Sequence, residues 1–456
     1  MKKSLLAIAA MTAFAGAAQA QSSVTVYGIL DVGYVGSTYL GTAATQSTYG
    51  AGLVAPGSGV QKQTTNSIGQ SAESSSRIGF KGSEDLGSGK SAIFTLEVGV
   101  NPNGNETTGG AIASTTGGGT GSGTFLSYNR QTFVGLKDNA IGTATIGTQY
   151  TPVFDVQSIT DAAGNNNMVG NAIYSGALQS GTGTFNVGQG PNAGISTSGL
   201  NAETGAFVTR ASNTLKLVSN RMAGLQGTVS YAMASNNQTQ TGANFSTANT
   251  GGANNNTMLG VALDYTWQKL QVVAAYQQLK SYNPAGGNAA NPSASNAQPT
   301  LSIANGTAMN FGLNALDNQS YAAATYDFGI AKAYLQYINR NFSSQVDSSY
   351  SAKRSATQIG VKSSLTPTIS AFATFGMGNS SVYGQSLPTQ AFRTFQVGSD
   401  YYLSKRTNLY AILGGYNQSS SGAGVVAGTN PNQAAINLSN FALSAANYAV
   451  GIRHTF

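Results

Sequence analysis

Two short segments of the chain place basic side chains in alternation with large apolar ones. In residues 77–81 (RIGFK) and 210–217 (RASNTLKL), the basic residues take one parity and the large apolar residues take the other. This pattern predicts a strand with one apolar face and one charged face. Arg77, Arg210 and Lys216 are therefore expected to present fixed positive charges to water, where they attract anions.

Arg130 lies in a third alternating segment, but its parity is ambiguous. Val134 and Leu136 share the parity of Arg130, which would turn the arginine toward the apolar side. If Phe133 faces the apolar side instead, Arg130 joins the charged face. The alternation alone leaves both orientations open.

The other residue types that support catalysis do not assemble into a catalytic centre. His454 is the only histidine and the chain has no cysteine, so neither a Ser-His-Asp relay nor the usual histidine or cysteine metal sites can be built. Gly89-Lys90-Ser91 resembles the end of a phosphate-binding loop, but Glu84 occupies the position of the first glycine of that motif. We therefore expect no enzymatic activity, no cofactor and no metal.

The composition is unusual for a soluble protein. Only 8% of the residues are charged, and glycine occupies 58 of 456 positions, against averages of about 25% and about 7%. Beyond residue 20, no apolar run approaches the roughly 18 residues of a membrane-spanning helix. Basic residues are scattered along the chain, so the net charge of +7 does not indicate a nucleic-acid partner. The composition favours a sheet with an aromatic-rich outer surface and polar loops.

Residues 1–20 have the organisation of a cleaved signal peptide. Lys2 and Lys3 precede an apolar centre at Leu5–Ala15, and Ala18-Gln19-Ala20 offers a small-residue cleavage site. The mature chain is expected to begin at Gln21, and the loss of two lysines lowers its net charge from +7 to +5. The protein is therefore expected to be exported.

From Gln21 onward, alternating stretches of about 9–13 residues recur, which is the length of a tilted membrane-spanning strand. The last stretch, Asn447–Phe456, is apolar on one face and would be an aggregation-prone edge unless it pairs with the first strand. That pairing closes the sheet into a barrel. The sixteen predicted strands are 24–35, 75–82, 91–100, 126–137, 142–150, 209–219, 224–234, 258–268, 269–280, 318–327, 330–341, 352–363, 368–378, 390–403, 407–417 and 447–456.

The even number of strands and the alternation of short turns with long loops predict a single all-β domain, residues 21–456, that is a transmembrane antiparallel β-barrel. In such barrels the short turns are periplasmic and the long loops extracellular. Side chains cannot fill a lumen of about sixteen strands, and charges at its narrowest ring set ion selectivity. Tyr401, Tyr402, Tyr410 and Tyr448 lie near strand ends and are expected in the aromatic girdles at the membrane interfaces.

Several segments spread over the mature chain make it resemble the trimeric, sixteen-stranded general porins of Neisseria-like and Burkholderia-like Gram-negative bacteria. These segments are SSVTVYGILDVGY, SRIGFKGSEDLGSGKSAIFTLE, NRQTFVGLKDNAIGTATIGTQYTP, YDFG, YYLSKRTNLYA and GIRHTF. The resemblance implies a homotrimer in the outer membrane, in contact with outer-membrane lipid and lipopolysaccharide. It also implies an open diffusion pore for small hydrophilic solutes and ions. The chain departs from the family pattern at Gly147-Thr148-Gln149, where relatives often carry an arginine after the glycine.

The resemblance further implies that the third long loop, residues 151–208, folds into the barrel and narrows it. Asp155, Asp161 and Glu203 are the only carboxylates of this loop, and we expect them opposite the basic wall. The resemblance assigns Arg130 of the NRQ motif to that wall, and it identifies Phe456 as the terminal aromatic recognised for membrane insertion. Because basic residues outnumber the loop acids, we expect a weakly anion-favouring pore. The expected basic wall is Arg77, Arg130, Arg210 and Lys216.

Three alternatives remain open. In the first, the barrel is a solute-specific channel with a binding ladder. In the second, it is a surface anchor or adhesin plugged by residues 151–208. In the third, it is a barrel enzyme of the omptin or phospholipase kind. Ion conductance would exclude a tight plug. Saturable block of the current by one class of solute would indicate a specific channel.

Overall fold

The computed structural model describes the strands and part of the loops. The described residues are 23–42, 60–102, 126–174, 184–185, 207–238, 252–282, 300–302, 308–310, 315–344, 351–383, 389–418, 425–426, 436–437 and 443–456. The expected signal peptide lies outside these ranges. Within them the chain is almost entirely β-structure, with one short helix, α2 (Pro152–Ser158). No helix in the described ranges has the length and apolar character needed to cross a membrane.

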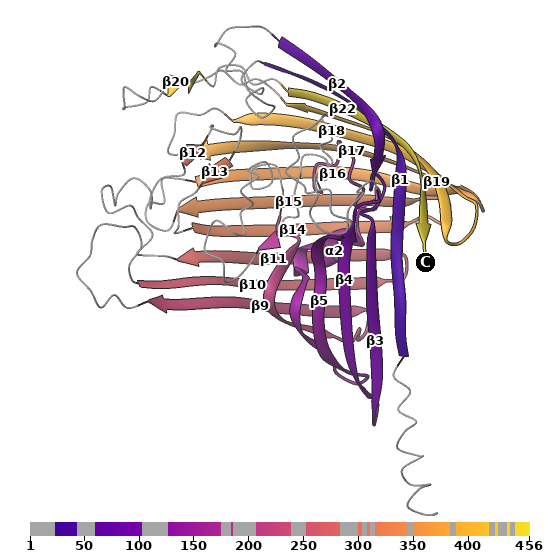
Figure 1. Cartoon of the computed structure of the whole chain (residues 1–456), viewed down its shortest axis with the longest axis vertical. Helices are drawn as coiled ribbons and strands as arrows, with labels where there is room; N and C mark the ends of the chain where they lie inside the picture. Colours follow the sequence, from indigo (N-terminus) through magenta and orange to yellow (C-terminus); the bar gives the residue numbers. More distant parts are fainter. Residues whose placement is uncertain are drawn as a thin grey trace, which may run out of the picture.

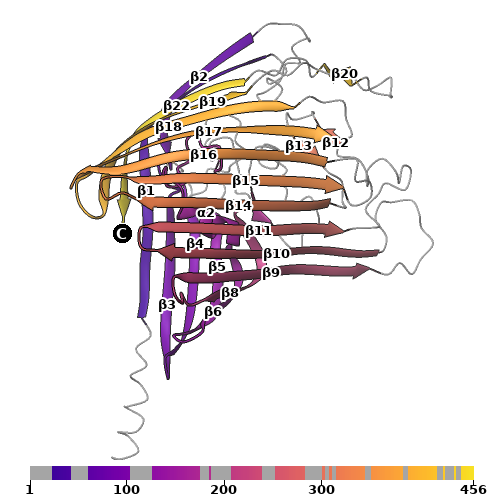
Figure 2. The same ribbon diagram turned by 180° about the vertical axis from the view of Figure 1, so that it is seen from behind.

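Sixteen antiparallel strands form a closed wall (Figures 1 and 2), as the sequence predicted. Neighbours in the chain are neighbours in the sheet, which is the arrangement that short turns enforce. The wall strands are β1 (Ser23–Thr42), β3 (Arg77–Gly87), β4 (Lys90–Val100), β5 (Leu126–Asp138), β6 (Gly142–Tyr150), β8 (Arg210–Ser219), β9 (Leu225–Gln238), β10 (Gly252–Trp267), β11 (Leu270–Tyr282), β14 (Ala315–Asp327), β15 (Lys332–Ser344), β16 (Ser351–Thr366), β17 (Ile369–Tyr383), β18 (Gln390–Tyr402), β19 (Thr407–Gln418) and β22 (Leu443–Thr455).

The last strand closes the barrel on the first. β22 pairs with β1 from Ile29 to Gly41, and β1 uses its other edge to pair with β3. The chain end continues this seam, because the amide of Gly28 donates to the carbonyl of Phe456 at 3.0 Å and the amide of Phe456 donates back at 3.1 Å. The predicted seam is confirmed, and the terminal strand has no free edge.

The two faces of the wall reverse the usual distribution of a soluble protein. Large apolar side chains point outward and are exposed, among them Val134, Ile146 and Leu263, with exposed fractions of 60%, 61% and 55%. Fully buried side chains on the inner face include the amides Gln277 and Gln396. This inversion is what a membrane-spanning barrel requires, since its outer face meets lipid and its inner face meets water and the polar backbone of the loop.

One strand lies where the sequence analysis expected only loop. β2 (Val60–Gln70) pairs with β1 from Val32 to Thr42, so it extends the sheet beyond the point where β3 leaves β1. Its sequence, VQKQTTNSIGQ, has Ile68 as its one large apolar residue besides the terminal valine. The apolar alternation that reveals the other strands is therefore missing here. The remaining short strands are β7 (Thr184–Phe185), β12 (Thr300–Ser302), β13 (Ala308–Asn310), β20 (Val425–Val426) and β21 (Ile436–Asn437).

The prediction of an interfacial girdle is wrong for Tyr410. Tyr401 and Tyr448 are on the outer face, where 48% and 43% of each is exposed, but Tyr410 is only 2% exposed and points inward. Its hydroxyl donates to Asp31 Oδ1 at 2.6 Å. Strand parity decides the side: Tyr410 alternates with the outward Leu409, so nearness to a strand end does not put it in the lipid interface.

Candidate functional site

The chain enters the barrel directly after β6. Thr151 caps α2, since its hydroxyl accepts a hydrogen bond from the amide of Phe154 at 3.4 Å, and Pro152 occupies the first turn, where no amide proton is needed. Val153 and Val156 are buried against apolar side chains on the inner faces of β10, β11 and β14. The helix therefore lies inside the ring of strands (Figure 1), and residues 151–174 cross the lumen.

Arg130 points into the lumen because of a β-bulge. Glu97 of β4 pairs with Gln131, whereas the next residue, Val98, pairs with Asn129. Arg130 is the extra residue of β5 between these pairs. An extra residue reverses the parity of what precedes it. Val134 therefore faces lipid while Arg130, of the same parity, is only 4% exposed inside the barrel.

Glu97 contacts two of the three arginines of this wall. Arg130 Nε donates to Glu97 Oε1 at 2.7 Å, and Arg77 Nε lies 3.8 Å from Glu97 Oε2. The hydroxyl of Tyr27 also donates to Glu97 Oε2, at 3.1 Å. Glu97 was not predicted from the sequence. Its alternation with the outward Leu96 could have identified it as an inward carboxylate beside the predicted basic residues.

Lys216 pairs with the intruding loop. Its ammonium group forms an ion pair with Asp155 of α2 and donates to the carbonyl of Tyr150 at 3.1 Å. The Tyr150 hydroxyl accepts from Arg130 at 2.8 Å, and the guanidinium carbon of Arg210 lies 5.1 Å from the centre of the Tyr150 ring. Tyr150 thus connects the basic residues of β5 and β8 at the start of the loop.

The predicted loop acids do not form one row opposite the basic wall. Asp155 of α2 lies against the basic wall, where it pairs with Lys216. Asp161 lies further along the loop and accepts hydrogen bonds from the amide of Asn165 at 2.8 Å and from the side chain of Asn171 at 3.0 Å. Burial raises the pKa of Asp161 above its usual range, and these hydrogen bonds oppose the rise. Glu203 lies outside the described residues. The structure therefore brings Arg77, Arg130, Arg210, Lys216 and Asp155 together and leaves Asp161 apart.

Five inward glutamines hold the loop against the opposite wall. They are 0–1% exposed, and we call them the glutamine belt: Gln277, Gln319, Gln336, Gln358 and Gln396. Adjacent members pair across strands, Gln277 with Gln319 and Gln336 with Gln358. Glutamine suits this position because its amide both donates and accepts, as backbone does.

The belt bonds mainly to loop backbone. Gln277 Nε2 donates to the carbonyl of Val208 at 3.0 Å, and the amide of Val208 donates to Gln319 Oε1 at 2.8 Å. Gln358 Oε1 accepts from the amide of Ala172 at 2.8 Å. Gln396 Nε2 donates to the carbonyls of Met168 and Val169 at 2.8 and 3.1 Å. These glutamines were not predicted from the sequence, although isolated glutamines of inward parity in apolar strands could have indicated them.

A second charged group lies on the inner face near the seam. Glu73, in the segment between β2 and β3, forms a 2.8 Å ion pair with Arg453 and accepts from Asn408 at 3.0 Å. Asp31 accepts from the amides of Glu73 and Ser74 at 2.8 and 2.7 Å. Burial raises the pKa of Glu73 to about 7, and Arg453 opposes this rise. This group places carboxylates on β1 and beside β19 and β22, on the other side of the seam strand β1 from Arg77 and Arg130.

No group of three or more potential metal ligands occurs in the described ranges. The geometry is that of a wide polar lumen, crossed by a loop whose base is basic. Such an arrangement selects solutes by size and charge.

Comparison with known proteins identifies the family. The family model described as Gram-negative porin matches residues 7–421 of the chain. The chain belongs to the Gram-negative porin family. An outer membrane porin protein of Bordetella pertussis is 26% identical to this porin over an alignment of 444 residues, which covers 90% of this chain and 93% of the relative.

Solved structures match the porin fold over nearly the whole chain. The anion-selective porin from Comamonas acidovorans matches with a TM-score of 0.60 at 19% identity, covering 96% of this chain and 100% of that one. OmpT of Vibrio cholerae, in a trimer form, matches with a TM-score of 0.52 at 13% identity, covering 95% and 99%. The protein is an outer-membrane porin of a Gram-negative bacterium, and its family and relatives are named as channels rather than enzymes.

Proposed function

We propose that this porin is a passive diffusion channel for small hydrophilic solutes and ions, weakly favouring anions, and that the residues around α2 form its constriction. One observation carries the proposal. Arg77, Arg130, Arg210 and Lys216 gather at the base of the loop, where Glu97 and Asp155 are the carboxylates within ion-pair distance among the described residues. The excess positive charge would concentrate anions there. Asp161, further along the loop, and Glu203, outside the described residues, remain in the proposal as the other acids of the loop that narrows the lumen.

The comparison with solved structures supports this sign of selectivity. The Comamonas acidovorans porin is described as anion-selective. Its low sequence identity makes it a guide to fold, so the charge of this chain's own lumen is the main support. The wide barrel and the belt that fixes the loop support a permanent narrowing rather than a closed plug.

Planar-bilayer recording across a salt gradient tests the proposal. The double variant Arg77→Gln, Arg210→Gln should keep stepwise ohmic conductance and shift the reversal potential toward cation preference. Lys405→Gln is a matched control, because Lys405 is exposed in the short turn after β18 and lies outside the lumen. An unchanged reversal potential in the double variant would contradict the assignment of these arginines.

Two other outcomes would favour the alternatives. A correctly folded barrel without current would favour a plugged barrel that serves as a surface anchor or adhesin. Saturable block by one class of solute would favour a solute-specific channel. Neither outcome depends on the arginine assignment, since both are read from the unaltered protein.

We also propose the assembly and export route. The porin forms a homotrimer in contact with lipid and lipopolysaccharide, and the trimer form of the Vibrio cholerae relative supports this. Residues 1–20 are a cleaved signal peptide, and Phe456 is the insertion signal. Phe456 is 39% exposed at the end of the seam, so its ring is accessible for recognition. N-terminal sequencing of the outer-membrane form should begin at Gln21, and deletion of Phe456 should slow insertion.

A further inference from the structure

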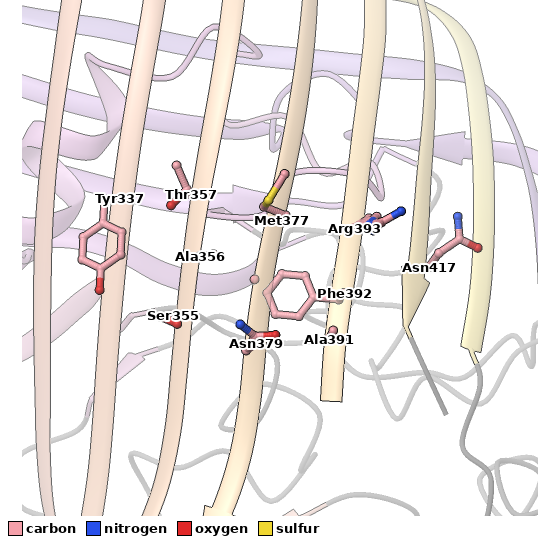
Figure 3. Close-up of a pocket in the computed structure, with 11 residues that line it drawn as sticks. Tyr337, Ser355, Ala356, Thr357, Met377, Asn379, Ala391, Phe392, Arg393 and Asn417 are labelled. Atoms are coloured by element: carbon pink, nitrogen blue, oxygen red, sulfur yellow. The ribbon is translucent and has the colours of Figure 1, made fainter. Parts of the chain in front are cut away.

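A groove of about 620 Å³ lies in the outer face of the wall, over β15 to β19 (Figure 3). Strand register shows which way it faces. Tyr337 pairs with Thr357, Thr357 with Met377, Met377 with Arg393, and Arg393 with Asn417. Paired residues of antiparallel strands point to the same face. Tyr337 and Met377 are 45% and 52% exposed, so this row belongs to the membrane-facing surface.

The groove lies at one border of the apolar band on the outer face, on the side nearer the long connections. The next row toward the short turns is entirely apolar and consists of Leu335, Ile359, Phe375 and Phe395. The next row toward the long connections is small or polar and consists of Asn339, Ser355, Asn379 and Ala391. Arg393 therefore lies at the boundary between the hydrocarbon core and the lipid headgroups, near the rim that is extracellular in outer-membrane barrels.

The charge of Arg393 has no counterpart among the described residues around it. Arg393 is exposed, and it forms no ion pair or hydrogen bond with the parts of the chain that the structure describes. Among described residues between 332 and 418, the only carboxylate is Asp400, which is 6% exposed and points inward. A second exposed base, Lys353, lies on β16 two rows beyond the groove row, toward the long connections. An outward arginine beside the apolar band favours an anion at the same depth.

The small side chains of the groove leave room for a hydrocarbon chain beside this charge. Ser355, Ala391 and Gly378 are among its lining residues, and Tyr337 lies toward its other side (Figure 3). Met377 lies in the middle of the row and provides a flexible apolar contact. The groove thus places the guanidinium group of Arg393 beside an apolar surface, an arrangement that fits an amphiphile with an anionic head group.

We propose that this groove is a binding site for a phosphorylated lipid of the outer leaflet, with a phosphate on Arg393 and an acyl chain over Met377 and Phe395. The proposal rests on the outer-membrane location of the porin and is independent of its ion preference. It therefore survives or fails separately from the constriction assignment, because Arg393 points away from the lumen.

Native mass spectrometry of the folded porin in an uncharged detergent tests the site. The probes are bisphosphorylated lipid A and the same lipid without its phosphates. Arg393→Gln should weaken binding of the phosphorylated probe about tenfold, the scale of one charge-assisted hydrogen-bonding contact. Arg393→Lys should retain most of the binding. Arg406→Gln is the control, because Arg406 is also exposed but lies in the short turn at the opposite rim.

Three results would overturn the proposal. Equal binding by Arg393→Gln and the unaltered porin would remove Arg393 from the site. Equal binding of the two probes would show that phosphate plays no part. Loss of oligomers in Arg393→Gln, without a change in lipid binding, would make the groove a contact between copies of the chain. Unchanged conductance in the variant would confirm that its barrel is folded.

Discussion

Arg130 Nε and Glu97 Oε1 lie 2.7 Å apart across a β-bulge that turns the arginine from the lipid side to the lumen. Arg77 contacts the other oxygen of the same carboxylate. Among the described residues, two cations thus share one anion. The bulge and the charge balance are linked, since without the extra residue Arg130 would face hydrocarbon at a cost of roughly 2–4 kcal/mol at the midplane.

Replacing Glu97 by Gln should strengthen the anion preference. The change removes the carboxylate that Arg77 and Arg130 share, while the amide oxygen still accepts a hydrogen bond from Arg130. The free energy of unfolding should fall by about 1–3 kcal/mol. Reversal potential in a salt gradient measures the selectivity. Glu84→Gln, at an exposed position on the same hairpin, should change neither quantity.

Replacing Gln396 by Leu should loosen the loop. The carbonyls of Met168 and Val169 lose their donor, and each lost bond costs roughly 0.5–1.5 kcal/mol. Amide hydrogen exchange in residues 166–173 should become faster by about tenfold, with increased open-channel noise. Gln278→Leu is the matched control, because that glutamine bonds Tyr276 and Asn318 outside the belt. Equal exchange in both variants would mean that the belt does not fix the loop.

Gly414 of β19 allows the backbone of the loop at Val169, which we call the loop tip, to pack closely against the wall. A Cβ on Gly414 would clash with the carbonyl oxygen of Val169, so Gly414→Ala must displace this part of the loop. We expect a loss of about 1–3 kcal/mol in the free energy of unfolding and an altered single-channel conductance. Gly227→Ala is the control, since its Cβ would have no neighbour closer than 3.8 Å. Wild-type conductance in Gly414→Ala would show that the tip does not narrow the pore.

The selectivity of the porin should depend on pH near neutrality through Glu73. The pKa of Glu73 is raised to about 7 by burial, with Arg453 lowering it and Asp400 and Asp31 raising it. As pH falls from 8 to 6, Glu73 takes up a proton and the lumen loses a negative charge. Anion preference should therefore rise toward pH 6, as measured by the reversal potential.

The same shift has a consequence for stability. Because the folded state holds this proton more tightly than the ordinary pKa of 4.5 implies, its contribution to folding is complete below about pH 4.5 and is lost as pH rises through about 7. Glu73→Gln should remove both pH effects. His454→Gln is the control, because His454 is the only histidine of the chain. A pH response that persists in Glu73→Gln and disappears in His454→Gln would contradict the assignment.

Most of the wall was predictable because side-chain direction in a strand follows parity. Ile78 and Phe80 determined the direction of Arg77, and Leu215 and Leu217 determined that of Lys216, without reference to distant parts of the chain. The terminal seam followed from the same rule. β2 was not predicted because it has no apolar face. Tyr410 was assigned to the wrong face because the prediction used its nearness to a strand end instead of its parity.

By itself, the sequence determined the barrel, its strand number, its seam and the inward direction of most charges, because each depends on local alternation and loop length. Tertiary structure decided the partners. Whether Arg130 faces in depends on the register between β4 and β5, and whether Asp155 meets Lys216 depends on the path of the loop across the lumen. Register and loop path are set by contacts between residues far apart in the chain, which no local pattern records.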